Sequence, residues 1–199
     1  MSRRGQRVQD ARGYVLHASA WRETSLIVQG FTREHGCVAL VAKGAKRPYS
    51  VLRPILATFQ PLSLSWSGAA EVRTLVRAES CGVRLLDGRA MMSGWYMNEL
   101  ILRLLAREDP HPGVFDAYEA ALDELSDPRR RSPAGALRRF EWLLLDETGY
   151  GQEGAPPDFE DGSSEPVLRQ RLRERLDALL DTPLRTRKVL LDLQRYQRP

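Results

Sequence analysis

The sequence is poor in the residues that build metal sites and covalent cross-links. Its two cysteines, Cys37 and Cys81, lie far apart and form no Cys-x-x-Cys pair, which excludes a disulfide framework and a four-cysteine zinc site within the chain. We expect both thiols to be ordinary apolar or half-buried side chains. The histidines, His17, His35 and His111, follow no metal-binding spacing. We therefore expect no metal and no cofactor.

Long apolar runs and catalytic motifs are also missing. No apolar stretch approaches the ~20 residues of a membrane helix, and no signal-peptide core follows the basic start, so we expect a cytoplasmic protein without a membrane partner. Ser67-Gly68 lacks the first glycine of a nucleophile elbow, and Ala42–Lys46 lacks the spacing of a phosphate loop. These absences predict a binding protein rather than an enzyme.

Charge is distributed unevenly along the chain. Residues 1–84 carry 13 Lys and Arg against 5 Asp and Glu, whereas residues 85–199 carry 17 against 21. Such polarity is typical of a protein whose basic half faces a polyanion, although a basic half can also be a solvated surface.

The hydrophobic pattern predicts two domains, residues 1–82 and 83–199. Short apolar segments and turn residues fill the first, and Leu62–Ser67 alternates apolar residues with serine, which is typical of a half-buried strand and places Trp66 in the core. Five short strands with a long third connection predict a closed oligonucleotide-binding (OB) barrel. The expected strands are Gly13–His17, Ser25–Thr32, Cys37–Ala42, Leu62–Ser67 and Glu71–Val76.

Beyond Gly82 the apolar period changes to that of α-helices. The fold class is therefore α+β, with a five-stranded OB barrel followed by an all-helical domain. Residues 152–165 are rich in Gly, Pro, Ser and acids and predict a mobile linker. The expected helical stripes are Met97–Leu105, Phe115–Leu125, Leu137–Leu144 and Leu168–Leu180, followed by a short segment Leu184–Leu193; the arginines at 169, 171, 173 and 175 are interpreted as a solvated face.

The stretch Lys43–Arg53 carries the clearest functional signal. It places four cations and Tyr49 in eleven residues, with Gly44 and Pro48 preventing regular structure. Single-stranded nucleic acid needs cations that follow its phosphates and a ring on which a base stacks. Trp21 is an open case between core and stacking, and Arg3, Arg4, Arg7 and Arg12 could extend the charged track. The predicted DNA-binding residues are Arg22, Arg33, Lys43, Lys46, Arg47, Tyr49 and Arg53.

Several of these segments, in this order, resemble the RecO family. The resemblance covers about residues 8–151 and is weaker in the last helix. The matching stretches are Trp21–Leu26, Phe31–Gly36, Leu40–Arg47, Phe59–Leu62, Ser65–Gly68, Tyr96–Leu100, Pro110–Pro112, Leu137–Glu141 and Gly149–Gly151.

The resemblance implies a bacterial DNA repair and recombination mediator with an OB barrel and a helical domain. Such a protein binds single-stranded DNA, and also double-stranded DNA, anneals complementary strands and assists recombinase loading near the nucleoid. Its implied partners are RecR and the acidic, aromatic C-terminal tail of the single-strand-binding protein. The residues implied for the tail contact are Leu137, Arg138, Arg139 and Phe140; alternatively, Leu137 and Phe140 are core and the arginines are solvated.

The chain differs from the family in one respect, and two other functions are compatible with its sequence. Many family members carry a longer, often zinc-binding segment after Gly-Tyr-Gly, whereas this chain has no cysteine there. An OB module that binds structured RNA without annealing activity is the main alternative, and a preference for RNA through the 2′-hydroxyl would indicate it. A metal-dependent nuclease is a third, which cleavage of an oligonucleotide would reveal.

Overall fold

The protein consists of two compact units, each with its own core. The computed structural model describes residues 6–127, 129, 133–151 and 154–189, so Arg3, Arg4, the start of the predicted linker and residues 190–193 lie outside it. The first unit comprises the chain up to Arg84 together with Ala106–Pro112, and the second comprises Leu85–Leu105 and the chain from Gly113 onward. Residues 106–112, predicted as part of the helical domain, therefore cluster with the strands.

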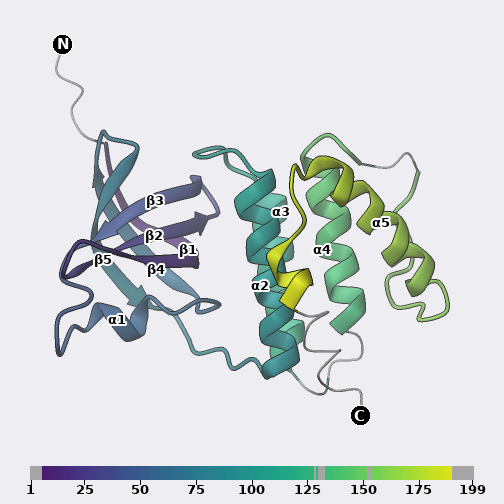
Figure 1. Cartoon of the computed structure of the whole chain (residues 1–199), viewed down its shortest axis with the longest axis horizontal. Helices are drawn as coiled ribbons and strands as arrows, with labels where there is room; N and C mark the ends of the chain where they lie inside the picture. Colours follow the sequence, from purple (N-terminus) through teal and green to yellow (C-terminus); the bar gives the residue numbers. More distant parts are fainter. Residues whose placement is uncertain (1–5, 128, 130–132, 152–153, 190–199) are drawn as a thin grey trace. The chain divides into compact units, whose positions relative to one another are not determined.

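The first unit is a closed five-stranded barrel of the OB type, which confirms the predicted fold class (Figure 1). Its strand order is β1-β2-β3-β5-β4, and all neighbours are antiparallel except β3 and β5. A short helix, α1, lies in the connection between β3 and β4. The elements are β1 (Gln6–Trp21), β2 (Ser25–Thr32), β3 (Gly36–Ala42), α1 (Leu52–Ile55), β4 (Leu62–Gly68) and β5 (Val72–Ser80).

β1 is much longer than the predicted strand Gly13–His17 because it pairs with two neighbouring strands. Its first half pairs with β4 and its second half with β2, and the register shifts between Val8 and Ala11 and again between Val15 and His17. Asp10, inside the first irregularity, has a φ of 53°. Bulges of this kind bend a strand and increase its twist, which lets one strand close the barrel.

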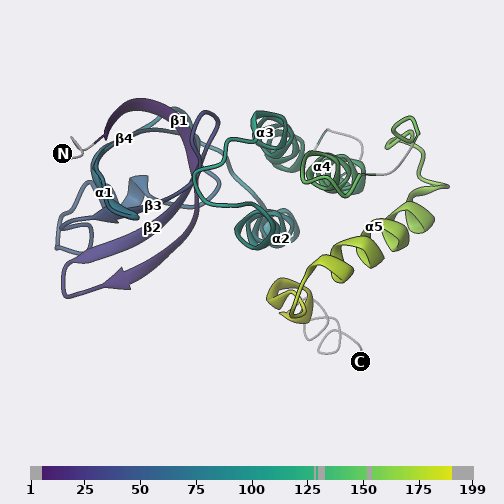
Figure 2. The same cartoon turned by 90° about the horizontal axis from the view of Figure 1, so that it is seen from above.

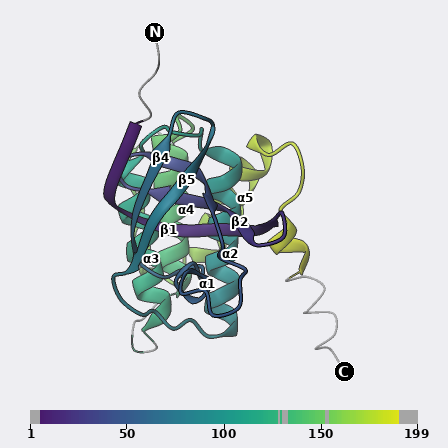
Figure 3. The ribbon, with the colours of Figure 1, turned by 90° about the vertical axis from the view of Figure 1, so that its left-hand side faces the viewer.

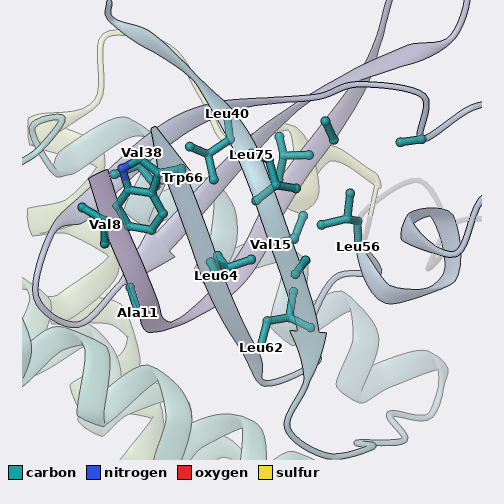
Figure 4. Close-up of a cluster of buried hydrophobic side chains, with 14 residues drawn as sticks. Val8, Ala11, Val15, Val38, Leu40, Leu56, Leu62, Leu64, Trp66 and Leu75 are labelled. Carbon is teal, nitrogen blue, oxygen red and sulfur yellow. The ribbon is translucent and has the colours of Figure 1, made fainter. Parts of the chain in front are cut away.

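The barrel core comes from the inward-facing residues of all five strands. The side chains of Val8, Val15, Leu64 and Trp66 converge inside it (Figure 4). Trp66 is fully buried, as the alternation with serine predicts. Burial of such apolar side chains is the main favourable term in folding.

Helix α1 closes one end of the barrel, an element that the sequence did not indicate. Figures 1 and 3 show it at that end. Leu56, just beyond the helix, is buried in the barrel core, and Leu52 and Ile55 pack against the same cluster. The long connection between β3 and β4 is thereby anchored.

Gly36, the first residue of β3, occupies a position where only glycine fits. Gly36 has a φ of 61°, and a Cβ atom there would lie 2.1 Å from the carbonyl oxygen of Asp109. The segment 106–112 runs beside β3, where the N–H of Glu108 donates to the carbonyl of Cys37.

Cys37 is buried, and burial raises the pKa of its thiol to about 12. Cys81 is exposed beyond the end of β5, so the expectation that it is buried or half-buried was wrong.

The second unit packs helices through the predicted apolar stripes. Its helices are α2 (Gly88–Leu104), α3 (Pro112–Ser126), α4 (Pro133–Glu147) and α5 (Glu165–Leu179). Figure 2 shows α2, α3 and α4 end-on and α5 from the side. α2 begins well before its predicted stripe because the Asp87 carboxylate caps it by accepting from the N–H of Ala90 at 2.8 Å. Within the described part of the chain, no helix is both long and apolar enough to cross a membrane.

The chain beyond α5 is hydrogen-bonded to two residues of α2, Glu99 and Arg103, and Arg103 donates to the carbonyl and the hydroxyl of Thr182. Glu99 accepts hydrogen bonds from the N–H groups of Arg185 and Thr186, from the Thr186 hydroxyl and from Arg103. Burial raises the pKa of Glu99, but these hydrogen bonds outweigh it and leave the pKa below its ordinary value. Glu165, predicted as the last linker residue, is the first residue of α5.

Candidate nucleic-acid interface and partner pocket

The β1–β2 turn and the chain leaving β3 meet at one end of the barrel. Trp21 pairs with Ser25 across the turn, and Leu26 pairs with Ala42 at the end of β3. The backbone N–H of Lys46 then donates to the carbonyl of Thr24 at 2.8 Å. This hydrogen bond joins the predicted basic loop to the turn.

The basic loop is irregular but anchored. Ala45 is fully buried in the barrel core, whereas Lys43, Lys46 and Arg47 around it are exposed. Gly44 has a φ of 73°, a conformation that glycine adopts without strain. The buried alanine therefore fixes a loop whose cations point to solvent.

A hollow of about 550 Å³ lies between the turn and the loop. It brings together three of the predicted DNA-binding residues, Arg22, Lys43 and Arg47, which are far apart in the sequence. Lys46 lies beside them, with its Nζ 3.4 Å from the Arg22 carbonyl oxygen. The remaining lining residues are Trp21, Glu23, Thr24, Ser25, Val41 and Gly44.

Trp21 provides an aromatic surface in this hollow. Its side chain is 44% exposed, and the Arg22 guanidinium lies 5.9 Å from the ring centroid. A half-exposed indole beside cations is the arrangement on which a nucleic-acid base stacks while its phosphates are neutralised. The sequence left Trp21 undecided because a tryptophan next to a strand is equally suited to a core.

The other predicted DNA-binding residues do not line the hollow. Tyr49 is fully exposed in the loop, and Arg53 is exposed on α1. Arg33 follows the opposite end of β2, where its N–H donates to the carbonyl of Arg12. Arg12 and Arg7 lie in the half of β1 that pairs with β4. The structure thus concentrates one part of the predicted track and disperses the rest.

A second concavity, of about 190 Å³, lies in the helical unit. α2 contributes Met92 and Tyr96 to it, and α4 contributes Leu137 and Arg138. Its surface is mostly apolar, and four of its lining residues are arginines. The other lining residues are Ser93, Glu141, Arg169, Arg173 and Arg187.

A buried polar network forms one wall of this pocket. Glu141 Oε1 accepts from Arg138 Nη2 at 2.8 Å and from the Tyr96 hydroxyl at 2.6 Å. Burial raises the pKa of the Glu141 carboxyl, against the effect of the Arg138 charge. Arg138 Nε and Glu141 Oε2 are buried without a hydrogen-bond partner among the described residues. Sequence reasoning missed Tyr96 and Glu141, although the i, i+3 spacing of Arg138 and Glu141 is a detectable signal.

The four predicted partner-binding residues separate in space because consecutive helical residues face different directions. Leu137 and Arg138 line the pocket, and Phe140 is fully buried in the helical core. Arg139 lies elsewhere on α4, paired with Glu124 and Glu160. Among the described residues, no group of three or more His, Cys, Asp or Glu side chains could hold a metal ion.

Comparison with known proteins identifies the family. The family model described as "Recombination protein O N terminal" matches residues 7–84, and "Recombination protein O C terminal" matches residues 85–154. A protein of Ralstonia nicotianae named "DNA repair protein RecO" is 43% identical, and the match covers 98% of this chain and 88% of that protein. The chain belongs to the RecO family.

Other RecO relatives are more similar over shorter stretches. The RecO protein of Aromatoleum aromaticum is 54% identical over 163 residues, which cover 81% of this chain and 66% of that protein. The RecO protein of Azoarcus sp. is 54% identical over 149 residues, 74% of this chain and 60% of that protein. The matched part of this chain thus spans less than two thirds of the length of these two relatives. The Ralstonia match extends over 241 residues although this chain has 199, so that relative contains residues without a counterpart here.

Proposed function

We propose that this chain acts in DNA repair and recombination by binding single-stranded DNA, annealing complementary strands and assisting recombinase loading on DNA coated by single-strand-binding protein. The observation that carries the proposal is the hollow that gathers Trp21, Arg22, Lys43 and Arg47 on an OB barrel. The names of the relatives support a repair role. The proposal requires binding alone and no catalytic residue.

The chemistry of the hollow suits a flexible polyanion. Each phosphate that Lys43, Lys46 or Arg47 neutralises releases condensed counterions, so affinity should fall steeply with salt. Trp21 offers a π-face that stacks on any base, which gives binding without strict sequence preference. Glu23, the one acid in the hollow, limits how closely the phosphates can approach the turn.

For the helical unit, we propose that the pocket at Leu137 and Arg138 receives the acidic, aromatic tail of the single-strand-binding protein. Its apolar surface suits a phenyl ring, and the exposed guanidiniums of Arg169 and Arg173 suit carboxylates, although each already faces an acid of its own helix, Glu165 at 4.0 Å and Asp177 at 3.7 Å. Because Phe140 is fully buried, its role in this proposal is to support the pocket wall from the core. RecR is the second proposed partner.

The first experiment is annealing of two complementary fluorescent oligonucleotides, bare and coated with single-strand-binding protein, over a salt series without ATP or metal. Acceleration of both substrates that fades with salt supports the proposal. Acceleration of bare strands alone keeps DNA binding but removes the tail contact. If neither substrate reacts faster, annealing is refuted, and binding to structured RNA becomes the function to test.

A charge-reversal pair tests the hollow directly. Lys43→Glu with Arg47→Glu should lower affinity for single-stranded DNA by tenfold or more. The matched control is Arg77→Glu with Arg89→Glu, which changes the net charge equally at two exposed positions outside the hollow. Equal losses in the two variants would mean that overall charge, and not this hollow, determines binding.

A further inference from the structure

The segment between α4 and α5 contacts the surface of α4 through one aromatic side chain and one ion pair. Residues Pro156–Gly162, here called the strap, contain a single aromatic residue, Phe159. Its ring lies edge-on to Trp142 of α4, with centroids 6.3 Å apart. The Arg139 guanidinium lies 5.6 Å from the Phe159 ring centroid. The sequence predicted this stretch as a mobile linker, and Phe159 was its one residue of a different kind.

Carboxylates surround the aromatic contact. Arg139 pairs through Nη2 with Glu160 of the strap at 3.0 Å and through Nη1 with Glu124 of α3 at 2.8 Å. The strap also carries Asp158 and Asp161, one on each side of the pair Phe159 and Glu160. The segment that occupies this face of α4 is thus one aromatic ring flanked by acids.

The strap holds its own shape through local turns. Asp158 Oδ1 accepts from the N–H of Glu160 at 2.9 Å, and Asp161 Oδ1 accepts from the N–H of Ser163 at 2.9 Å. Hydrogen bonds from Ser163 and Ser164 lower the pKa of Asp161. Side chains that fold the backbone locally in this way present Phe159 without help from a strand or helix.

We propose that the Arg139–Trp142 surface of α4 is a docking site for a partner segment in which an aromatic residue lies between carboxylates, and that the strap is its intramolecular occupant. A partner of this chemistry must displace Phe159 before it can bind. The site differs from the pocket at Arg138, whose lining includes neither Arg139 nor Trp142, and it does not depend on DNA binding by the barrel.

The exposure of the contacts makes displacement feasible. The side chain of Arg139 is 35% exposed and that of Glu160 is 53% exposed, and ion pairs in such positions contribute little. If the strap leaves the site open for only a fraction of the time, the apparent affinity for the partner is reduced to that fraction of the intrinsic affinity. A tether at both ends gives the strap a high effective concentration, so it competes strongly despite weak contacts.

The test uses a fluorescein-labelled peptide with the sequence of residues 156–162, added to the full-length protein. Phe159→Ala should vacate the site and raise the affinity for this peptide at least tenfold over the unsubstituted chain. Adding Arg139→Ala to Phe159→Ala should abolish the gain. A peptide with alanine in place of its phenylalanine should bind neither protein.

Controls separate docking from misfolding and from the proposed function. Phe159→Tyr keeps the ring and should leave peptide binding weak, while circular dichroism reports whether each variant is folded. Single-stranded DNA affinity, measured on the same samples, should be unchanged, so that failure of DNA binding and failure of the docking site remain distinct. Equal peptide affinity of Phe159→Ala and the unsubstituted chain would overturn the proposal, as would tight binding that persists after Arg139→Ala.

Discussion

At the scale of single residues, neighbours in sequence often have different surroundings, and this determines what each can do. Arg138 is buried against Glu141, whereas Arg139 is half-buried and pairs with Glu124 of α3 and with the exposed Glu160. These two arginines share a motif and were therefore predicted to act together. The direction that each one faces depends on where the core lies around α4, which the motif does not reveal. Trp66 was predictable, because its alternation with serine indicates a buried face directly.

Trp21 gives the sharpest residue-level test of strand binding. Trp21→Ala should weaken binding of an oligo-dT by about 5- to 150-fold, since loss of one stacked base costs about 1–3 kcal/mol. The salt dependence should stay unchanged because no charge is removed, whereas Arg47→Ala should reduce the salt slope by about one. Fluorescence anisotropy over a salt series measures both quantities. Trp21→Phe, which keeps a ring, is the control; unaltered affinity of Trp21→Ala would place base stacking elsewhere.

Gly36 gives a residue-level test of the barrel. Gly36→Ala should destabilise the protein by about 2 kcal/mol or more, because it adds left-handed strain and places a methyl group against the Asp109 carbonyl. Gly149→Ala is the matched control, since Gly149 also has a positive φ but nothing within 4 Å of the added Cβ. Urea denaturation measures both. Similar losses in the two variants would mean that segment 106–112 moves aside without cost.

At the scale of elements, the sequence indicated where strands and helices lie but not where they end. The apolar stripe that begins at Met97 predicted a helix, yet α2 starts at Gly88 because Asp87 caps it. β1 extends far beyond the predicted Gly13–His17, because the backbone of its first half pairs with β4. This half was not predicted because Arg7, Gln9 and Arg12 are polar and give no strand signal. α1 was missed because four residues are too few to show a period. Ends and short connectors depend on tertiary partners that no local pattern reveals.

Glu99 tests how the chain beyond α5 is held. Because its pKa is lowered from 4.5, the ionised carboxylate stabilises this attachment above about pH 4.5, and the stabilisation is lost as pH falls through the lower folded pKa. Glu99→Gln should accelerate hydrogen exchange at the Arg185 and Thr186 amides about tenfold at neutral pH, since hydrogen bonds to a charged acceptor are the stronger kind.

The same two amides provide the control. Their protection in the unsubstituted protein should decline on acidification, while in Glu99→Gln it should not change over that pH range. Asp181→Asn, which alters an exposed carboxylate near the same segment, should leave both amides unaffected. Persistent protection in Glu99→Gln would show that other contacts, such as the hydrogen bonds from Arg103 to Thr182, hold the segment.

At the scale of the whole molecule, the chain carries two separate cores and an excess of positive charge on one of them. The change of hydrophobic period near Gly82 indicated two kinds of structure. It did not indicate that Ala106–Pro112 belongs with the barrel. This segment contacts the barrel through pairs such as Arg73 with Glu108, whose residues are 35 apart in sequence. Such long-range pairing is beyond any pattern read along the chain.

Separate cores predict separate responses to core mutations. Leu64→Ala, in the barrel, should lower barrel stability by about 2–5 kcal/mol, and Leu144→Ala should do the same for the helical unit. Variants that retain only Trp66 or only Trp142 report each unit by fluorescence during denaturation. Each mutation should shift only the transition of its own unit. Equal shifts of both probes would mean that the two units unfold as one.

The length of β1 has a consequence for how the protein is made. Its second half can form a hairpin with β2 as soon as residue 32 has been synthesised, but its first half has to wait for β4, whose last paired residue is Gly68. At about 5–20 residues per second, the nascent chain spends several seconds with half of a strand unpaired. An unpaired edge is a template for association with other chains. Slower translation between residues 32 and 68 should therefore increase the fraction of newly made protein that aggregates.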